Sequence, residues 1–246
     1  ADEISSAIGP DGQVRVEISR SIASSGRPKS EIVQILTLGP DSRELDIHIR
    51  IDWHESEKFL KLSFPIDIHA EQVAAETQFG HVWRPTHSNT SWDYARFETC
   101  QHRFLFVPEQ GWGVAFANDS TYGYDAQRKT VAGGATVTDV RFSLLRAPKF
   151  PDPQSDQGHH TMRFSIRPGA TILDAVNLGY QLAFPALDLD GNEPIPALVH
   201  SSSPEVIIDT VKLAEDGSRD LIVRIYESIG SRARCKLSFA GVAEEI

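Results

Sequence analysis

The sequence predicts an all-β protein, in which one large antiparallel sandwich precedes a small β domain. Two observations support this. Apolar and polar residues alternate along several segments, most clearly over Leu45–Trp53, and a period of two is typical of half-buried strands. Helical spacing is convincing over one segment only, residues 170–182, which Pro168 and Gly169 precede. A chain of 246 residues is long enough for such a pair of domains.

The large domain is predicted over residues 1–185. In order along the chain, we expect its strands at residues 13–19, 31–38, 44–53, 60–68, 102–108, 112–119, 139–146 and 159–169. The turn Pro108–Gly113 predicts a hairpin between two of them. Pro65 cannot donate a backbone hydrogen bond, so its strand should lie at an edge or carry a bulge. Residues 147–158, rich in proline and aspartate, indicate a long loop.

The small domain is predicted over residues 186–246, after a linker at residues 188–196. Strands are expected at 205–213, 220–228 and 233–239, and the first two are separated by the turn at 214–219. Such a sheet would leave part of an apolar face uncovered. We therefore expect truncation of the small domain at its end, and of the large domain at its N-terminal side, where the chain opens without methionine.

Charge and cysteine content exclude several classes of function. The formal net charge is -10 and no basic run is present, which argues against nucleic acid and anionic membranes as partners. No apolar run approaches the roughly 20 residues of a membrane span. Cys100 and Cys235 lie far apart and fit no metal spacing, so a reducing compartment, the cytoplasm, is expected.

The chain carries no motif that assigns a catalytic or metal site. Glycoside hydrolysis needs two carboxylates about 5–10 Å apart, and no spacing selects a pair from Glu76, Asp93, Glu98, Asp119 and Asp125. The histidines lack the spacing of a metal motif, and the serines that of a nucleophile elbow. These residues alone therefore favour structural roles for the acids and histidines, and they select no catalytic or metal-binding residue.

Residues 78–98 combine aromatic and polar side chains in a way that suits sugar recognition. Trp83, Trp92 and Tyr94 alternate with Arg84, Asn89 and Asp93. Sugars bind to aromatic faces and to planar polar groups that reach their hydroxyls. Aromatic side chains of a β domain also commonly fill a core or a seam, so both interpretations stay open from composition alone.

Three long strings follow one another along the chain: ETQFGHVWRPTHSNTSWDYARFE with HRF after it, GWGVAFANDSTYGYD and RFSLLRAPKFPDPQSDQGHH. In this order they resemble the C-terminal β region of glycoside hydrolase family 38, the α-mannosidases, in their bacterial and cytosolic branch. TVKLAEDGSRDLIVRIYESIG, at 210–230, resembles the small terminal β domain of the same enzymes. The resemblance covers nearly the whole chain.

The resemblance implies a mutarotase-like supersandwich and, for the parent protein, a retaining exo-α-mannosidase. The nucleophile and a zinc or other divalent ion would belong to a separate N-terminal catalytic barrel, so this fragment alone should be inactive and hold no cofactor. Its partners would be that barrel and mannose-containing glycans, and the full-length enzyme could be an oligomer.

The resemblance also assigns roles to individual residues. The family's active-site arginine maps onto Arg146, with Tyr122, Tyr124 and Asp125 as further substrate-binding residues at the rim of the mannose site. Residues 78–98 would form two strands and a connecting loop. Within them, we expect a structural or interface role for six residues, with Trp83 and Trp92 filling a seam: Arg84, His87, Asn89, Trp92, Asp93 and Arg96.

Two alternatives remain at this stage. The chain could be a free-standing carbohydrate-binding module, or an independent mutarotase-like sugar epimerase that uses a histidine and a glutamate as acid and base.

Overall fold

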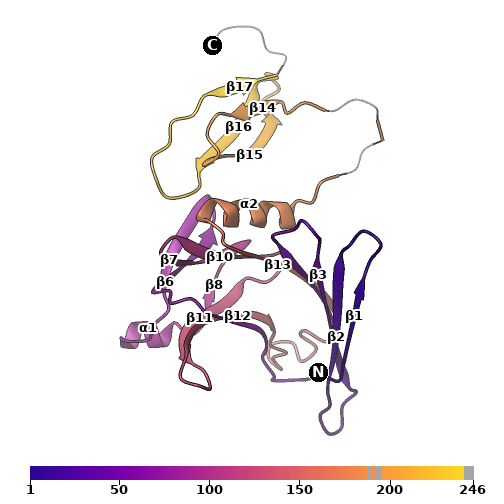
Figure 1. Ribbon diagram of the computed structural model, residues 1–246. Coiled ribbons are helices and arrows are strands. Elements are labelled where there is room, and N and C mark those ends of the chain that lie inside the picture. Colours follow the sequence, from indigo (N-terminus) through magenta and orange to yellow (C-terminus); the bar gives the residue numbers. More distant parts are fainter. Residues whose placement is uncertain (188–189, 192–194, 241–246) are drawn as a thin grey trace. The chain divides into compact units, whose positions relative to one another are not determined.

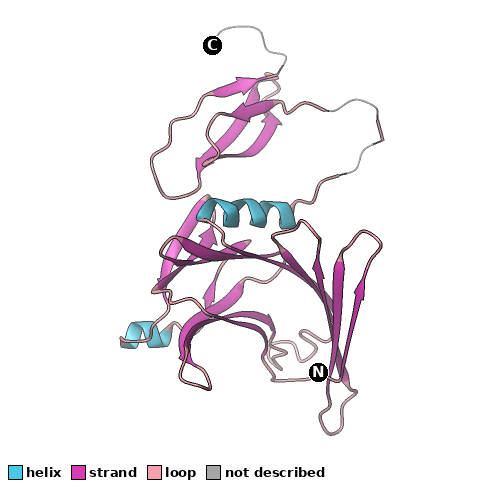
Figure 2. Cartoon of the chain, in the orientation of Figure 1, coloured by secondary structure: helices cyan, strands magenta, loops and turns pink. Residues whose placement is uncertain are grey.

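The computed structural model describes residues 1–187, 190–191 and 195–240, and within them antiparallel strands dominate (Figures 1 and 2). These residues divide into two units, one of residues 1–76 and 83–185, the other of residues 77–82 and 186–246. The predicted all-β fold is confirmed. The predicted linker at 188–196 falls largely outside the described residues.

The first unit contains a nine-stranded antiparallel sheet, with the strand order β1-β2-β3-β4-β13-β10-β9-β6-β7. In chain order its strands are β1 (Glu3–Ile8), β2 (Val14–Ile22), β3 (Ser30–Leu38), β4 (Leu45–Trp53), β6 (Gln72–Thr77), β7 (Gly80–Pro85), β9 (Phe104–Glu109), β10 (Trp112–Asn118) and β13 (Gly158–Pro168). Strands β1 and β6 were not predicted, whereas β7 is the first of the two strands expected within residues 78–98. The β9–β10 hairpin is confirmed, and Gly111 adopts a positive φ of 76° in its turn.

A four-stranded antiparallel sheet faces the large one, with the order β5-β12-β11-β8. Its strands are β5 (Leu60–Ile66), β8 (Thr99–Cys100), β11 (Gly123–Thr130) and β12 (Thr136–Leu145). Strand β5 lies at the edge, which confirms the prediction from Pro65. Residues 146–157 form the predicted loop between β12 and β13.

The core of the first unit fills the space between the two sheets. Phe142 of β12 is fully buried, and its ring centroid lies 5.2 Å from that of Phe164 and 5.9 Å from that of Phe116, both on the large sheet. Phe64 of β5 completes the cluster at 5.4 Å from Phe116. Because alternate residues point to opposite faces, the intervening positions of both sheets are left for polar side chains.

Helix α2 (Ile172–Ala183) covers the outer face of the large sheet, as Figure 1 shows. Thr171 caps it and exchanges hydrogen bonds with Asp174, a capping box that fixes where the helix starts. A Cβ atom at Gly179 would lie 3.1 Å from Arg103 Cβ, so glycine here permits the close approach of helix and sheet. None of the described helices is long and apolar enough to cross a membrane.

The second unit contains two small antiparallel pairs. Strand β14 (Val199–Ser201) pairs with β17 (Leu237–Phe239), and β15 (Val206–Leu213) pairs with β16 (Leu221–Glu227). The turn between β15 and β16 is confirmed, because the Ala214 amide donates to the Asp220 carbonyl. The third predicted strand is shorter than expected. Within this unit, Phe79 packs edge-on against Tyr226, with centroids 5.7 Å apart.

Candidate functional site

A pocket of about 380 Å³ lies in the first unit, where segment 83–99 passes the edge of strand β11. Strand β8 pairs with β11 only at Gly123 and Tyr124, so the following β11 residues are not covered by a neighbouring strand on that side. Six of the predicted site residues line this pocket together: Arg84, His87, Asp93, Arg96, Tyr124 and Asp125. The pocket is therefore the candidate functional site.

One wall of the pocket contains the short helix α1 (Ser91–Ala95). Thr90 caps it, because its side chain accepts from the Asp93 amide at 3.1 Å while Asp93 accepts from the Thr90 amide. Asp93 Oδ2 also lies 3.6 Å from His87 Nδ1. The hydrogen bond from the Thr90 side chain holds the pKa of Asp93 below its usual range.

This helix corrects the prediction that residues 78–98 form two strands and a loop. Strand β7 is present, but Thr90–Asp93 starts a helix where the second strand was expected. The hydrogen bonds within this segment also differ from those expected. Asp93 forms its hydrogen bonds with Thr90, not with Arg84 or Arg96. The spacing Thr-x-x-Asp is a sequence signal of a helix start and could have revealed this element.

Arg84 and Tyr124 place buried polar atoms at the pocket. Arg84 Nε and the Tyr124 hydroxyl are inaccessible to solvent and have no hydrogen-bond partner within the described part of the chain. Burial raises the pKa of the Tyr124 phenol, while the neighbouring Thr99 side chain and the charge of Arg84 act in the opposite direction. Unpaired buried polar groups are costly, which makes both atoms candidates for ligand contacts.

The pocket is bordered by aromatic rings that face solvent. The exposed fraction is 75% for Tyr94, 69% for Phe97 and 47% for Trp83, and all three line the pocket. Trp92, on helix α1, is 76% exposed and does not fill a seam, so that prediction is wrong for this residue. A cluster of exposed rings beside a polar pocket indicates a contact surface.

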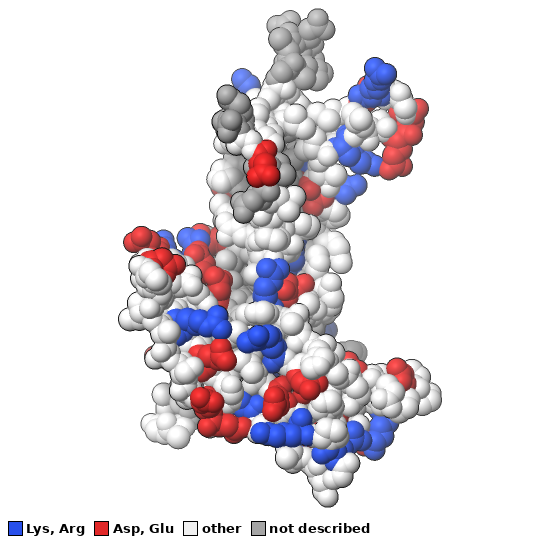
Figure 3. Space-filling model, turned by 90° about the vertical axis from the view of Figure 1, so that its right-hand side faces the viewer, with Lys and Arg blue, Asp and Glu red and all other residues white. Residues whose placement is uncertain are grey.

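Asp125 belongs to an ion-pair network on the outer face of the smaller sheet. Its carboxylate accepts from Lys61 Nζ and from Arg141 Nη2, the latter at 2.7 Å. Lys61 also contacts Glu98 at 2.5 Å. The registers pair Asp125 with Arg141 and Lys61 with Ser143, which brings these side chains to one face. Figure 3 shows that acidic and basic side chains are similarly interspersed on the face it presents.

Asp139, on the same face of β12, makes stability dependent on pH. Burial raises the pKa of this carboxyl, but hydrogen bonds from Lys129 at 2.7 Å and Ser63 at 2.6 Å outweigh burial, and the pKa is lowered. The folded pKa lies below the unfolded one, so this stabilisation is complete above about pH 4 and is lost as pH falls through the folded pKa.

We expect Asp139→Asn to lower the free energy of unfolding by about 2 kcal/mol at pH 7, because hydrogen bonds to charged groups are strong, and by much less near pH 2. Urea unfolding at a series of pH values measures the difference. Asp41→Asn, at an exposed turn residue, is the control. A loss for Asp139→Asn that stayed constant from pH 7 to pH 2 would contradict the assignment.

Four other predicted site residues do not line the pocket: Arg146, Tyr122, Asn89 and Trp92. Arg146 is exposed just beyond β12, and its backbone amide donates to Asp156 at 2.9 Å. Tyr122 is exposed and stacks on His102, with ring centroids 5.8 Å apart. The Asn89 amide donates to His87 Nδ1 at 3.4 Å. Arg146 therefore does not share this pocket with Tyr124 and Asp125.

The carboxylates and histidines considered from sequence are dispersed or engaged with basic groups. Glu76 accepts hydrogen bonds from the backbone amide and guanidinium of Arg103, and Asp119 pairs with Arg163 at 2.9 Å. No group of three or more His, Cys, Asp or Glu residues in the described ranges could hold a metal ion.

The fold and the pocket define an antiparallel β-sandwich protein with an aromatic-bordered polar site, and comparison with known proteins gives its family. Residues 2–154 match the glycosyl hydrolases family 38 C-terminal domain, and residues 205–245 match the family 38 C-terminal beta sandwich domain. The chain belongs to glycosyl hydrolase family 38, as a C-terminal region of its α-mannosidases.

Named relatives agree with this assignment. The chain is 37% identical to "Alpha-mannosidase 2C1" of Homo sapiens over 97% of its own length and 23% of that protein. It is 33% identical to "Alpha-mannosidase" of Saccharomyces cerevisiae, of which it spans 22%. An alpha-mannosidase structure from Enterococcus faecalis covers 96% of this chain with a TM-score of 0.77 at 18% identity, and this chain covers 31% of it; that likeness concerns the fold.

Proposed function

We propose that this chain is a non-catalytic region of a retaining exo-α-mannosidase, an enzyme that removes terminal α-mannosides. The relatives named as α-mannosidases are several times longer, since the chain spans 23% and 22% of two of them. Catalysis, and the divalent metal implied by the family, would then reside in another part of a longer polypeptide. In this proposal the sandwich is a scaffold against which a catalytic barrel packs.

The second part of the proposal is that the pocket beside β11 contacts carbohydrate. The observation that carries it is the pair of buried, unpartnered polar atoms, Arg84 Nε and the Tyr124 hydroxyl, in a pocket bordered by exposed rings. Sugar hydroxyls would satisfy the polar atoms, and the C–H face of a sugar would pack on Tyr94 or Trp83. The rim of the mannose site would thus include residues of this chain.

The first test is hydrolysis of p-nitrophenyl α-mannoside by the chain alone, with and without added Zn²⁺. We expect no turnover above background in either condition. Turnover by this chain alone would overturn its assignment as a non-catalytic region.

The second test uses the polypeptide that carries this chain together with its catalytic domain. We expect Arg84→Met or Tyr94→Ala to lower kcat/KM by about tenfold or more, because each removes a contact to the glycan. Phe150→Ala is the matched control, since Phe150 is 86% exposed and lies in the 147–158 loop, away from the pocket lining. Unchanged kcat/KM in both pocket variants would remove the carbohydrate contact from the proposal.

The exposed rings favour one second candidate, a carbohydrate-binding module that acts without a catalytic domain. Calorimetry of the chain with methyl α-mannoside separates the two. If the pocket is completed by contacts from a catalytic barrel, the chain alone should bind methyl α-mannoside with a Kd in the millimolar range or not at all. Micromolar binding that Arg84→Met abolishes would favour the independent module.

For cellular location we propose the cytoplasm. Support comes from the cysteines, because Cys100 and Cys235 are both free thiols in the structure and Cys100 is exposed. Exposed free thiols persist in reducing compartments.

A further inference from the structure

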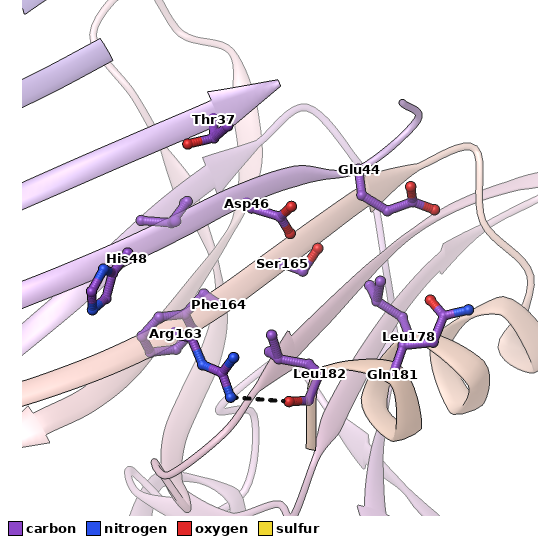
Figure 4. A pocket seen from close by; sticks show the side chains of 11 residues that line it. Thr37, Glu44, Asp46, His48, Arg163, Phe164, Ser165, Leu178, Gln181 and Leu182 are labelled. Carbon is purple, nitrogen blue, oxygen red and sulfur yellow. Dashed lines mark hydrogen bonds between the residues drawn. The ribbon is translucent and has the colours of Figure 1, made fainter. Parts of the chain in front are cut away.

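A second pocket, of about 410 Å³, lies on the outer face of the large sheet, on the opposite side from the core. Strands β3, β4 and β13 form its floor, and the C-terminal half of helix α2 forms one side (Figure 4). None of its lining residues lines the pocket beside β11. Nothing in the proposed function uses this site.

The strand registers explain why polar side chains converge here. Thr37 pairs with Asp46, and Asp46 pairs with Ser165, so these three side chains form one row across three strands. His48 and Arg163 form the next row on the same face. Ile47 and Phe164, between these positions, are buried in the core on the other face. Figure 4 shows the row beside Gln181 and Leu182 of α2.

The two strongly charged pairs at this pocket are already satisfied. Arg163 donates to Asp119 at 2.9 Å and to the Leu182 carbonyl at 3.3 Å. Glu44 accepts from Arg167 at 3.0 Å. Neither pair leaves a cation free to bind an anion such as phosphate.

One buried polar group at this pocket lacks a partner. Ser165 is only 2% exposed, and its hydroxyl has no hydrogen-bond partner within the described ranges. Asp46 and His48 line the same pocket, where Asp46 is exposed and His48 is partly buried. An unsatisfied buried hydroxyl is costly, and a ligand with hydroxyl groups would satisfy it.

We propose that this second pocket binds a neutral polyhydroxylated ligand, a hexose unit of a glycan. Asp46 accepts hydrogen bonds from vicinal hydroxyls, while Ser165 and Gln181 can both donate and accept. Leu182, which is partly exposed on α2, offers an apolar side for the C–H face of a ring. The volume lies at the lower end of the range of small-molecule pockets, which suits one or two sugar rings.

Backbone amide NMR of the intact chain tests the proposal, with methyl α-mannopyranoside as probe. We expect concentration-dependent shifts at residues 46–48 and 163–165. Asp46→Ala should weaken this binding by about tenfold, because it removes charge-assisted hydrogen bonds, and Ser165→Ala should weaken it less. Glu31→Ala is the matched control, since Glu31 is an exposed acid of β3 outside the pocket lining. Each variant must first reproduce the amide dispersion of the parent chain.

The outcomes separate this inference from the proposed function. Shifts confined to residues 83–99 and 124–127 would report binding at the pocket beside β11 and would overturn the proposal for the second pocket. Shifts at residues 46–48 that Asp46→Ala leaves unchanged would also overturn the proposal for the second pocket. Ethylammonium and inorganic phosphate serve as comparison probes. If either shifted the second pocket while the mannoside did not, the site would take an ion and the sugar assignment would be wrong.

Discussion

Replacing Phe142 by alanine is expected to lower the free energy of unfolding by about 4 kcal/mol. Phe142 has no exposed surface, and its ring contacts Phe64, Phe116 and Phe164 from both sheets. Truncation removes a large apolar side chain and leaves a cavity at the point where the sheets meet, which neighbouring side chains can fill only in part.

The matched comparison is Trp92→Ala. Trp92 is 76% exposed on helix α1, so its loss should cost less than about 0.5 kcal/mol. Urea unfolding monitored by far-UV circular dichroism, a signal that the loss of one tryptophan changes little, measures both variants. If Trp92→Ala destabilised the chain as much as Phe142→Ala, Trp92 would have to be packed in a seam and the exposed surface beside β11 would not exist as described.

The difference between these two aromatic residues shows what the sequence could predict about the fold. Phe142 lies in an alternating segment, and alternation marks which side chains face the core. The same signal predicted β4, β5 and β13 with nearly correct bounds. Trp92 lies in a segment without a period, and its helix is only five residues long. Aromatic content alone does not distinguish a buried ring from an exposed one, because that depends on the tertiary contacts of the segment.

Strands β6 and β11 were missed for a related reason. Val73, Ala74 and Ala75 of β6 are all buried, so the apolar and polar residues of this strand do not alternate. In β11, charged residues alternate with Tyr124 and Ala126, and their ion pairs to β5 and β12 compensate for weak apolar content. Cross-strand partners of this kind cannot be read from one segment alone.

Part of the candidate site was predicted from the family resemblance and not from the alternation of apolar and polar residues. The resemblance to family 38 named Tyr124 and Asp125, and the structure brings both to the pocket that Arg84 lines. Arg146 was named by the same resemblance but follows the last residue of β12, away from this pocket. The second pocket had no sequence signal, because Thr37, Asp46 and Ser165 come together only through the register of three strands.

Replacing Asp125 by alanine is the second change with a large expected effect, a loss of about 3 kcal/mol in the free energy of unfolding. The side chain of Asp125 is 3% exposed and that of Lys61 is 16% exposed, so removal of the carboxylate leaves a largely buried ammonium with fewer partners. Breaking one side of a buried ion pair is strongly destabilising for this reason. Arg141 is less affected, since it is 31% exposed and lies 4.0 Å from Asp139.

A double-mutant cycle with Lys61→Met separates this structural role of Asp125 from a role in ligand binding. If the carboxylate mainly balances the charge of Lys61, the double variant should lose less stability than the sum of the single variants, by at least about 1 kcal/mol. Additive losses would contradict the network. Amide shifts at residues 83–99 and 124–127 on addition of methyl α-mannoside to the double variant then report the pocket beside β11. Retained binding would assign Asp125 to the support of the pocket wall, whereas lost binding in a chain of restored stability would assign its carboxylate to the ligand.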